Sequence, residues 1–100
     1  MSHPIKHSVL LKMHREAIQK IVLKHHALNV RVFGSVALNE DHAGSDLDLL
    51  IDPTPDTTLM DIGAMRAELK ALLGVPVDVF TPHALPEHFR EDMVKKALPL

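Results

Sequence analysis

Two kinds of hydrophobic pattern alternate along the chain, and this alternation most constrains the fold. Apolar residues recur at helical spacing near the start, in the middle and near the end of the sequence, whereas the segments between them are short and rich in β-branched residues. The pattern predicts helices over 5–28, over 59–72 and from Pro86 onward, and strands over 30–33, 47–51 and 75–80. Strands separated by helices favour an α/β (α+β) fold: a small mixed three-stranded sheet with helices packed on it, in the order α-β-β-α-β-α.

Proline, glycine and short polar residues mark the ends of these segments. Pro53 should close the second strand, because proline cannot donate a hydrogen bond to a sheet. Asp56 or Thr57 can cap the middle helix, and Gly74 suits the position just after its end. Pro86 suits the first turn of the last helix. The length of 100 residues is that of one small domain, so we expect one domain over residues 1–100.

Composition excludes several classes of protein. Eleven basic and thirteen acidic residues give a formal charge of −2, without the basic excess of a domain that binds a nucleic-acid backbone. Phe33, Phe80 and Phe89 are too few and scattered to stack on bases, and we expect them in the core. The absence of Cys excludes disulfides, zinc knuckles and thiolate nucleophiles. No apolar run has the length of a membrane span, so we expect a soluble cytoplasmic protein.

Asp46 and Asp48 stand two residues apart on a predicted strand. Their carboxylates should therefore share one side of the sheet, about 6.5–7 Å apart along the strand. Two such charges repel by roughly 2 kcal/mol at an effective dielectric of 20. Exposure to water tolerates this repulsion, and so does a bound cation such as Mg²⁺, which takes carboxylate and phosphate oxygens.

Asp78, in the third predicted strand, favours the cation. If that strand neighbours the one over 47–51, three carboxylates converge on one side of the sheet. A strand with one solvated face explains the alternation of Asp and Leu by itself. The convergence of three charges is harder to explain without a metal.

Gly34 and Ser35 directly follow the first predicted strand. Gly permits close backbone approach, Ser offers a hydroxyl, and free N–H groups in a following turn of helix would point at a phosphate. Such a pair alone is usually a turn. Its spacing of ten residues from Asp46 makes the combination more specific.

Gly-Ser, ten residues, Asp-x-Asp and a third Asp on a later strand resemble the nucleotidyltransferase signature of the DNA polymerase beta superfamily. The small size and the ending Ala-Leu-Pro-Leu are similar to the minimal nucleotidyltransferases, the MNT-type antitoxins paired with HEPN-domain toxins. The resemblance implies a nucleotide-binding set and a catalytic, metal-binding set. The first comprises Gly34, Ser35 and Ser45, and the second comprises Asp46, Asp48 and Asp78.

The activity that the resemblance implies is in-line attack of a hydroxyl on the α-phosphate of ATP, with pyrophosphate leaving. Of two Mg²⁺ ions, one would activate the hydroxyl, helped by Asp78, and the other would neutralise the triphosphate. The implied acceptor is a tyrosine of a partner HEPN toxin, which is silenced by AMP within a hetero-oligomer.

Two alternatives stay open. Related proteins often carry Arg where this chain has Leu38, so a charge-assisted phosphate donor is missing. A weak or vestigial enzyme that neutralises its partner by binding is therefore one alternative. The other is transfer to a small molecule such as an aminoglycoside, although such enzymes usually carry a further substrate domain.

Other polar residues give weaker signals. His25 and His26, at the end of the first predicted helix, are expected to be solvated or to cap that helix. Arg31 lies next to the motif and is a minor candidate for a phosphate contact.

Overall fold

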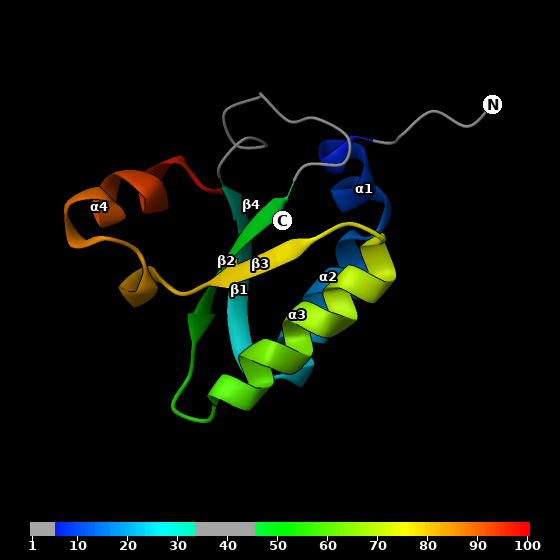
Figure 1. Cartoon of the computed structure of the whole chain (residues 1–100), viewed down its shortest axis with the longest axis horizontal. Coiled ribbons are helices and arrows are strands. Elements are labelled where there is room, and N and C mark those ends of the chain that lie inside the picture. Colours follow the sequence, from blue (N-terminus) through cyan, green and yellow to red (C-terminus); the bar gives the residue numbers. More distant parts are fainter. Residues whose placement is uncertain (1–5, 34–45) are drawn as a thin grey trace.

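The computed structural model describes residues 6–33 and 46–100 of the chain. Helices and strands alternate much as the sequence predicts (Figure 1). The elements are α1 (His7–Met13), α2 (Arg15–Lys24), β1 (Ala27–Phe33), β2 (Leu47–Pro53), α3 (Leu59–Leu73), β3 (Val77–Phe80), the 3-10 turn η1 (Pro82–Ala84), α4 (Glu87–Lys96) and β4 (Leu98–Pro99).

The sheet is mixed, as expected, but it has four strands rather than three. Its order is β3-β2-β1-β4, with β2 antiparallel to β1 and parallel to β3. The additional strand is β4, in which Leu98 pairs with Val32 and Pro99 with Arg31. Two residues are too few to show a period-two pattern, so β4 is defined by its pairing with β1 and not by local sequence.

The first predicted helix differs most from the structure. It is interrupted at His14, where the backbone leaves helical values (φ −113°, ψ 16°), and α2 ends at Lys24. His26 then adopts a positive φ of 66°, and Leu28 belongs to β1. Leu28 follows Ile21 by seven residues, a spacing that fits a helix even though the chain has already turned.

The two faces of the sheet pack against different helices. Leu47, Leu49 and Ile51 of β2 are fully buried in the larger core, together with side chains of α2 and α3. Leu50 points to the opposite face and is buried in a second cluster with Phe33, against which residues of α4 pack. Figure 1 shows α2 and α3 on one side of the sheet and α4 on the other. Asp48, with the parity of Leu50, lies on the α4 side.

Local signals place both ends of α3. Thr58, one residue beyond the expected caps, forms a capping box with Asp61, whose backbone N–H donates to the Thr58 hydroxyl over 3.0 Å. Thr57 does not cap because its hydroxyl donates to the His26 carbonyl over 2.6 Å. Gly74 ends the helix in the left-handed conformation (φ 72°), as predicted.

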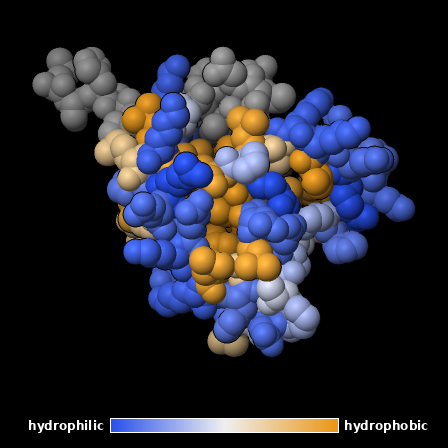
Figure 2. All heavy atoms as spheres, turned by 180° about the vertical axis from the view of Figure 1, so that it is seen from behind, coloured by the Kyte–Doolittle hydropathy of each residue, from blue (hydrophilic) through white to orange (hydrophobic). Residues whose placement is uncertain are grey.

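The phenylalanines do not all lie in the core. Phe33 is buried and meets half-buried Phe80 edge to face, with ring centroids 5.4 Å apart. Phe89 is 52% exposed, so its predicted core position is wrong. Other large apolar side chains are also exposed, and Figure 2 shows hydrophobic residues gathered near the middle of the face opposite that of Figure 1. Among the described residues, no helix is long and apolar enough to cross a membrane.

Candidate active site

Two of the three predicted site aspartates lie side by side on neighbouring strands of the sheet. In the parallel pairing of β2 with β3, Asp48 is the direct partner of Asp78. The condition on which the predicted convergence depended is thus met, because the second and third predicted strands are neighbours. Neighbouring strands lie about 4.8 Å apart, which brings two half-buried acidic residues together on one face.

Apolar neighbours fix this alignment. Leu47 and Leu49, on either side of Asp48, are fully buried. Their register partners on either side of Asp78 are Val77, which is buried, and Val79, which is half-buried. The backbone N–H of Leu47 also donates to the carbonyl of Pro76 over 2.9 Å, at the start of the paired segment. A slip of one residue would turn the leucines to the other face, so burial holds the carboxylates in register.

Burial and the neighbouring carboxylates raise the pKa of Asp48. Burial raises the pKa of the Asp48 carboxyl, and the neighbouring charges of Asp78 and Asp46 raise it further. Asp46 itself is exposed and directly precedes β2. The negative charges of both other carboxylates therefore disfavour the ionised form of Asp48.

The donor chemistry of these residues fits a hard divalent cation, which takes carboxylate oxygens and relieves repulsion between them. The structure supplies the pair formed by Asp48 and Asp78. Within residues 6–33 and 46–100, however, no three His, Cys, Asp or Glu side chains already form a metal-binding group. The predicted set thus consists of an aligned pair and a neighbouring Asp46.

The predicted nucleotide-binding residues Gly34, Ser35 and Ser45 lie outside the described residues. Leu38 also lies outside them. The phosphate-binding part of the site is therefore still a prediction from the sequence.

Sequence analysis missed Arg66, a cation at the aspartate pair. Its Nη2 atom lies 3.3 Å from Oδ1 of Asp78, and its side chain is 62% exposed. Arg66 belongs to α3, which packs against β3. Arg66 precedes Asp78 by twelve positions, and no local pattern indicates that helix packing brings them together.

Arg31 is engaged within the sheet. Its Nη1 and Nη2 atoms donate to the two carboxylate oxygens of Asp52 over 3.0 and 2.9 Å, and the Asn29 amide donates to the same carboxylate. The hydrogen bonds from Arg31 are the main reason that the pKa of Asp52 is lowered. This bidentate ion pair joins β1 to β2, so the role that the structure shows for Arg31 is within the sheet.

The two histidines that follow α2 lie as expected, since His25 is the C-cap residue of that helix and His26 is exposed, and both also have carboxylate partners. His25, only 12% exposed, contacts the carboxylates of Glu68 and Asp61, and His26 Nδ1 lies 3.3 Å from Asp61. Lys24 adds an ion pair of 2.8 Å to Glu68. These contacts join the end of α2 to α3, and none of them involves Asp48 or Asp78.

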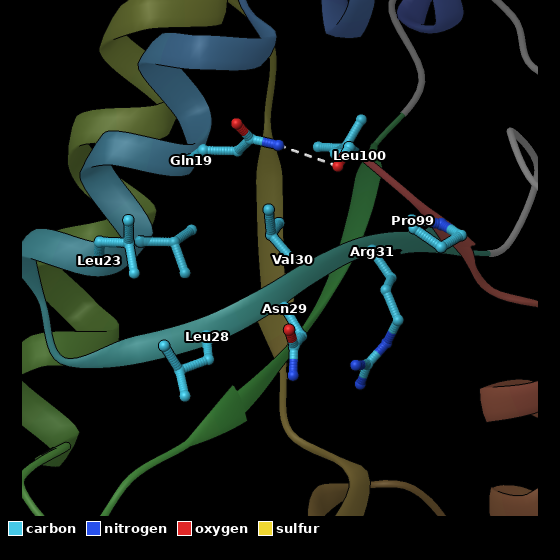
Figure 3. A pocket seen from close by; sticks show the side chains of 9 residues that line it. Gln19, Leu23, Leu28, Asn29, Val30, Arg31, Pro99 and Leu100 are labelled. Atoms are coloured by element: carbon cyan, nitrogen blue, oxygen red, sulfur yellow. Dashed lines mark hydrogen bonds between the residues drawn. The ribbon is translucent and has the colours of Figure 1, made fainter.

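A hollow of about 480 Å³ lies between α2, β1 and β4 (Figure 3). Its walls are largely apolar, and on one side the Gln19 amide donates to the Leu100 carbonyl over 2.9 Å. None of the three site aspartates lines it. The hollow is therefore separate from the aspartates of the candidate active site.

Comparison with known proteins agrees with the fold and identifies the family of the chain. The nucleotidyltransferase domain family matches residues 11–100. The chain belongs to this family, which confirms the resemblance inferred from the Gly-Ser and Asp-x-Asp pattern.

Two similar proteins have names that specify a kind of nucleotidyltransferase. A Methanocaldococcus jannaschii protein named "Putative protein adenylyltransferase" is 31% identical over 84 residues, which are 84% of this chain and 90% of that protein. A second protein of that organism with the same kind of name is 26% identical over 89 residues, or 89% of this chain and 88% of that protein.

Solved structures share the architecture. One described as a "putative minimal nucleotidyltransferase" has a TM-score of 0.81 and 41% identity, covering 90% of this chain and 92% of its own. A chain of a toxin–antitoxin crystal structure with AMP-PNP has a TM-score of 0.70 and covers 84% of this chain and 69% of its own. Its identity is 16%, so this second likeness concerns the fold alone.

Proposed function

We propose that this protein transfers AMP from ATP to a hydroxyl group of a partner protein, with release of pyrophosphate, and that this modification neutralises the partner. The observation that carries the proposal is the register that sets Asp48 beside Asp78, with Asp46 adjoining. Membership of the nucleotidyltransferase domain family supports the class of reaction.

The site residues would have separate roles in this reaction. Asp46, Asp48 and Asp78 would hold two Mg²⁺ ions. Bound there, the ions would supply positive charge to the triphosphate and make the attacking hydroxyl more acidic. Asp78, on the edge strand, would orient that hydroxyl and help remove its proton. Gly34, Ser35 and Ser45 would hold the phosphates.

The bond changes in this reaction balance without another reagent. The acceptor oxygen forms a bond to the α-phosphorus as the bond from that phosphorus to the β-phosphate bridging oxygen breaks. The hydroxyl proton leaves through Asp78 to solvent, and pyrophosphate carries away the electron pair of the broken bond.

A protein acceptor is favoured over a small molecule. The relatives that this chain matches are named as protein adenylyltransferases, and a toxin–antitoxin structure with AMP-PNP shares its fold. Exposed apolar side chains such as Leu23, Leu28 and Leu98 offer surface that a protein partner could cover. We propose a tyrosine of a HEPN-domain toxin as the acceptor, a hetero-oligomer of the two chains, a single domain over 1–100, and the cytoplasm as their location.

A transfer assay tests this proposal. The purified chain is incubated with α-labelled ATP, Mg²⁺ and a HEPN-domain toxin encoded by the same genome. Mass spectrometry should then find the added mass of an adenylyl group, which is AMP less one water, on a toxin tyrosine. The Asp46→Asn/Asp48→Asn variant should give no label, whereas Asp56→Asn, which removes an exposed carboxylate outside the site, should label as the original chain does.

Neutralisation of the toxin separates catalysis from binding. The proposal predicts that the double variant fails to neutralise the toxin. If the variant still neutralises it and the original chain transfers no label, the protein is an antitoxin that acts by binding, as the substitution of Leu38 for Arg first suggested.

A further inference from the structure

Arg66 has a defined position at the proposed metal-binding group. It projects from α3, and one end of its guanidinium lies 3.3 Å from the Asp78 carboxylate. Asp78 is in turn the register partner of Asp48. A positive charge thus lies next to one of the two aligned carboxylates.

Arg66 is distinctive among the cations of the described residues. In the parts of the chain that the structure describes, the ion pairs bring one basic side chain to the set of Asp46, Asp48 and Asp78, and that side chain is Arg66. It neutralises part of the charge that a divalent cation would otherwise neutralise.

The ion pair between Arg66 and Asp78 is weak enough for a bound cation to replace it. The Arg66 side chain is 62% exposed and that of Asp78 is 38% exposed, so water screens their attraction. Exposed pairs of this kind contribute little to stability. The flexible Arg66 side chain can move into solvent while β3 keeps its place beside β2.

We propose that Arg66 is a positioning residue that acts as the counter-ion of Asp78 in the metal-free protein and sets the affinity of the aspartate group for a divalent cation. This inference rests on the proposed function, because it assumes that the aspartates hold Mg²⁺. A unit charge a few ångströms from a divalent ion opposes binding, and in partly screened water this amounts to about a three- to tenfold weaker affinity.

A titration with Mg²⁺ alone tests the inference without any measurement of activity. Backbone amide NMR shifts of Asp48 and Asp78 are followed as MgCl₂ is added, while KCl keeps the ionic strength constant. Arg66→Gln should bind Mg²⁺ about three- to tenfold more tightly than the original chain. Arg66→Lys keeps the charge and should stay within about twofold of it.

The control removes the same kind of side chain elsewhere. Arg15 is exposed at the start of α2, and Arg15→Gln should leave the Mg²⁺ affinity within about twofold of the original value. The spectra also show directly whether each variant is folded.

The outcomes separate the two proposals. If the original chain binds Mg²⁺ and Arg66→Gln binds it equally or more weakly, the counter-ion role is wrong and the metal site stands. An effect of Arg15→Gln equal to that of Arg66→Gln would also overturn the role of Arg66, because the cause would then be net charge. If no chain binds Mg²⁺, both the metal site and this inference fail.

Discussion

Asp48 and Asp78 are register partners on parallel strands, and the fold aligns them despite their mutual repulsion. The alignment is determined by the buried residues Leu47 and Leu49, whose burial leaves Asp48 to face the other side. Carboxyl groups with a perturbed pKa are typical of functional sites, and the proposed function assigns these charges to a ligand.

The first prediction concerns the stability of the metal-free protein. The folded pKa of Asp48 is raised, so its contribution to stability is fully present below the unfolded pKa and is lost as pH rises through the folded pKa. Asp48→Asn removes this loss. Because Asp48 is partly exposed, we expect on the order of 0.5–1 kcal/mol, which raises the midpoint at neutral pH by about 2–8 °C.

Thermal unfolding in EDTA at two pH values measures this effect. The gain should shrink at about pH 3.5, where the carboxyl is largely protonated in both states. Asp56→Asn serves as the control, since its carboxylate is exposed and outside the pair. A lower midpoint for Asp48→Asn at neutral pH would show that the charge of Asp48 does not destabilise the folded protein.

A second prediction separates Arg31 from the nucleotide. Arg31→Gln removes both hydrogen bonds to Asp52, and hydrogen bonds to charged groups contribute about 1.5–3 kcal/mol. Because Asp52 can regain water, we expect a loss of about 1–3 kcal/mol in urea unfolding. Arg31→Lys should recover only part, since lysine lacks the planar fork.

The stabilisation of the Arg31→Gln variant by ATP and Mg²⁺ should match that of the original chain. Unchanged stability in urea, together with a lost response to ATP, would instead make Arg31 a phosphate ligand.

A third prediction concerns acid. The Thr58 backbone N–H, with His26 and His25, lowers the pKa of Asp61 to about 2, and Lys24, followed by His25, lowers that of Glu68. A lowered folded pKa gives stability that is present above the unfolded pKa and is lost as pH falls through the folded pKa. We therefore expect the thermal midpoint to fall steadily from about pH 4.5 toward pH 2.

The Asp61→Asn/Glu68→Gln variant tests this explanation. It should be less stable than the original chain at pH 6, and its midpoint should depend less on pH between about 4.5 and 2. Asp92→Asn, which removes an exposed carboxylate paired with Lys96, should keep the original pH dependence. An unaltered slope in the double variant would place the acid sensitivity elsewhere in the chain.

The sequence was sufficient to predict local features of the site but not its long-range contacts. The parity of Asp48 and Leu49 predicts which side chain is buried, and the left-handed end at Gly74 follows from residue type. The pairing of Asp48 with Asp78 could not be predicted with certainty, because it depends on the order of the strands in the sheet. Arg66 could not be predicted, because its contact depends on how α3 packs against β3.

Competition between contacts explains the remaining differences. Thr57 has the right residue type to cap α3, but its hydroxyl bonds to His26 of a distant segment, and Thr58 takes the role. Leu28 fits helical spacing, yet the turn at His26 assigns it to a strand. Such choices are made by tertiary structure and are not visible in local periodicity.

The central claim, a working nucleotide site at Asp46 and Asp48, is tested most directly by thermal unfolding with ATP, with and without Mg²⁺. Each chain is compared with itself, so the effect of Asp48 on basal stability cancels. At 100 times its Kd a ligand stabilises by about 2.7 kcal/mol, which for a domain of this size raises the midpoint by roughly 10 °C or more. We predict a Mg²⁺-dependent rise of this kind in the original chain and none in Asp46→Asn/Asp48→Asn. No rise in the original chain at millimolar ATP, or an equal rise in the double variant, would contradict the claim.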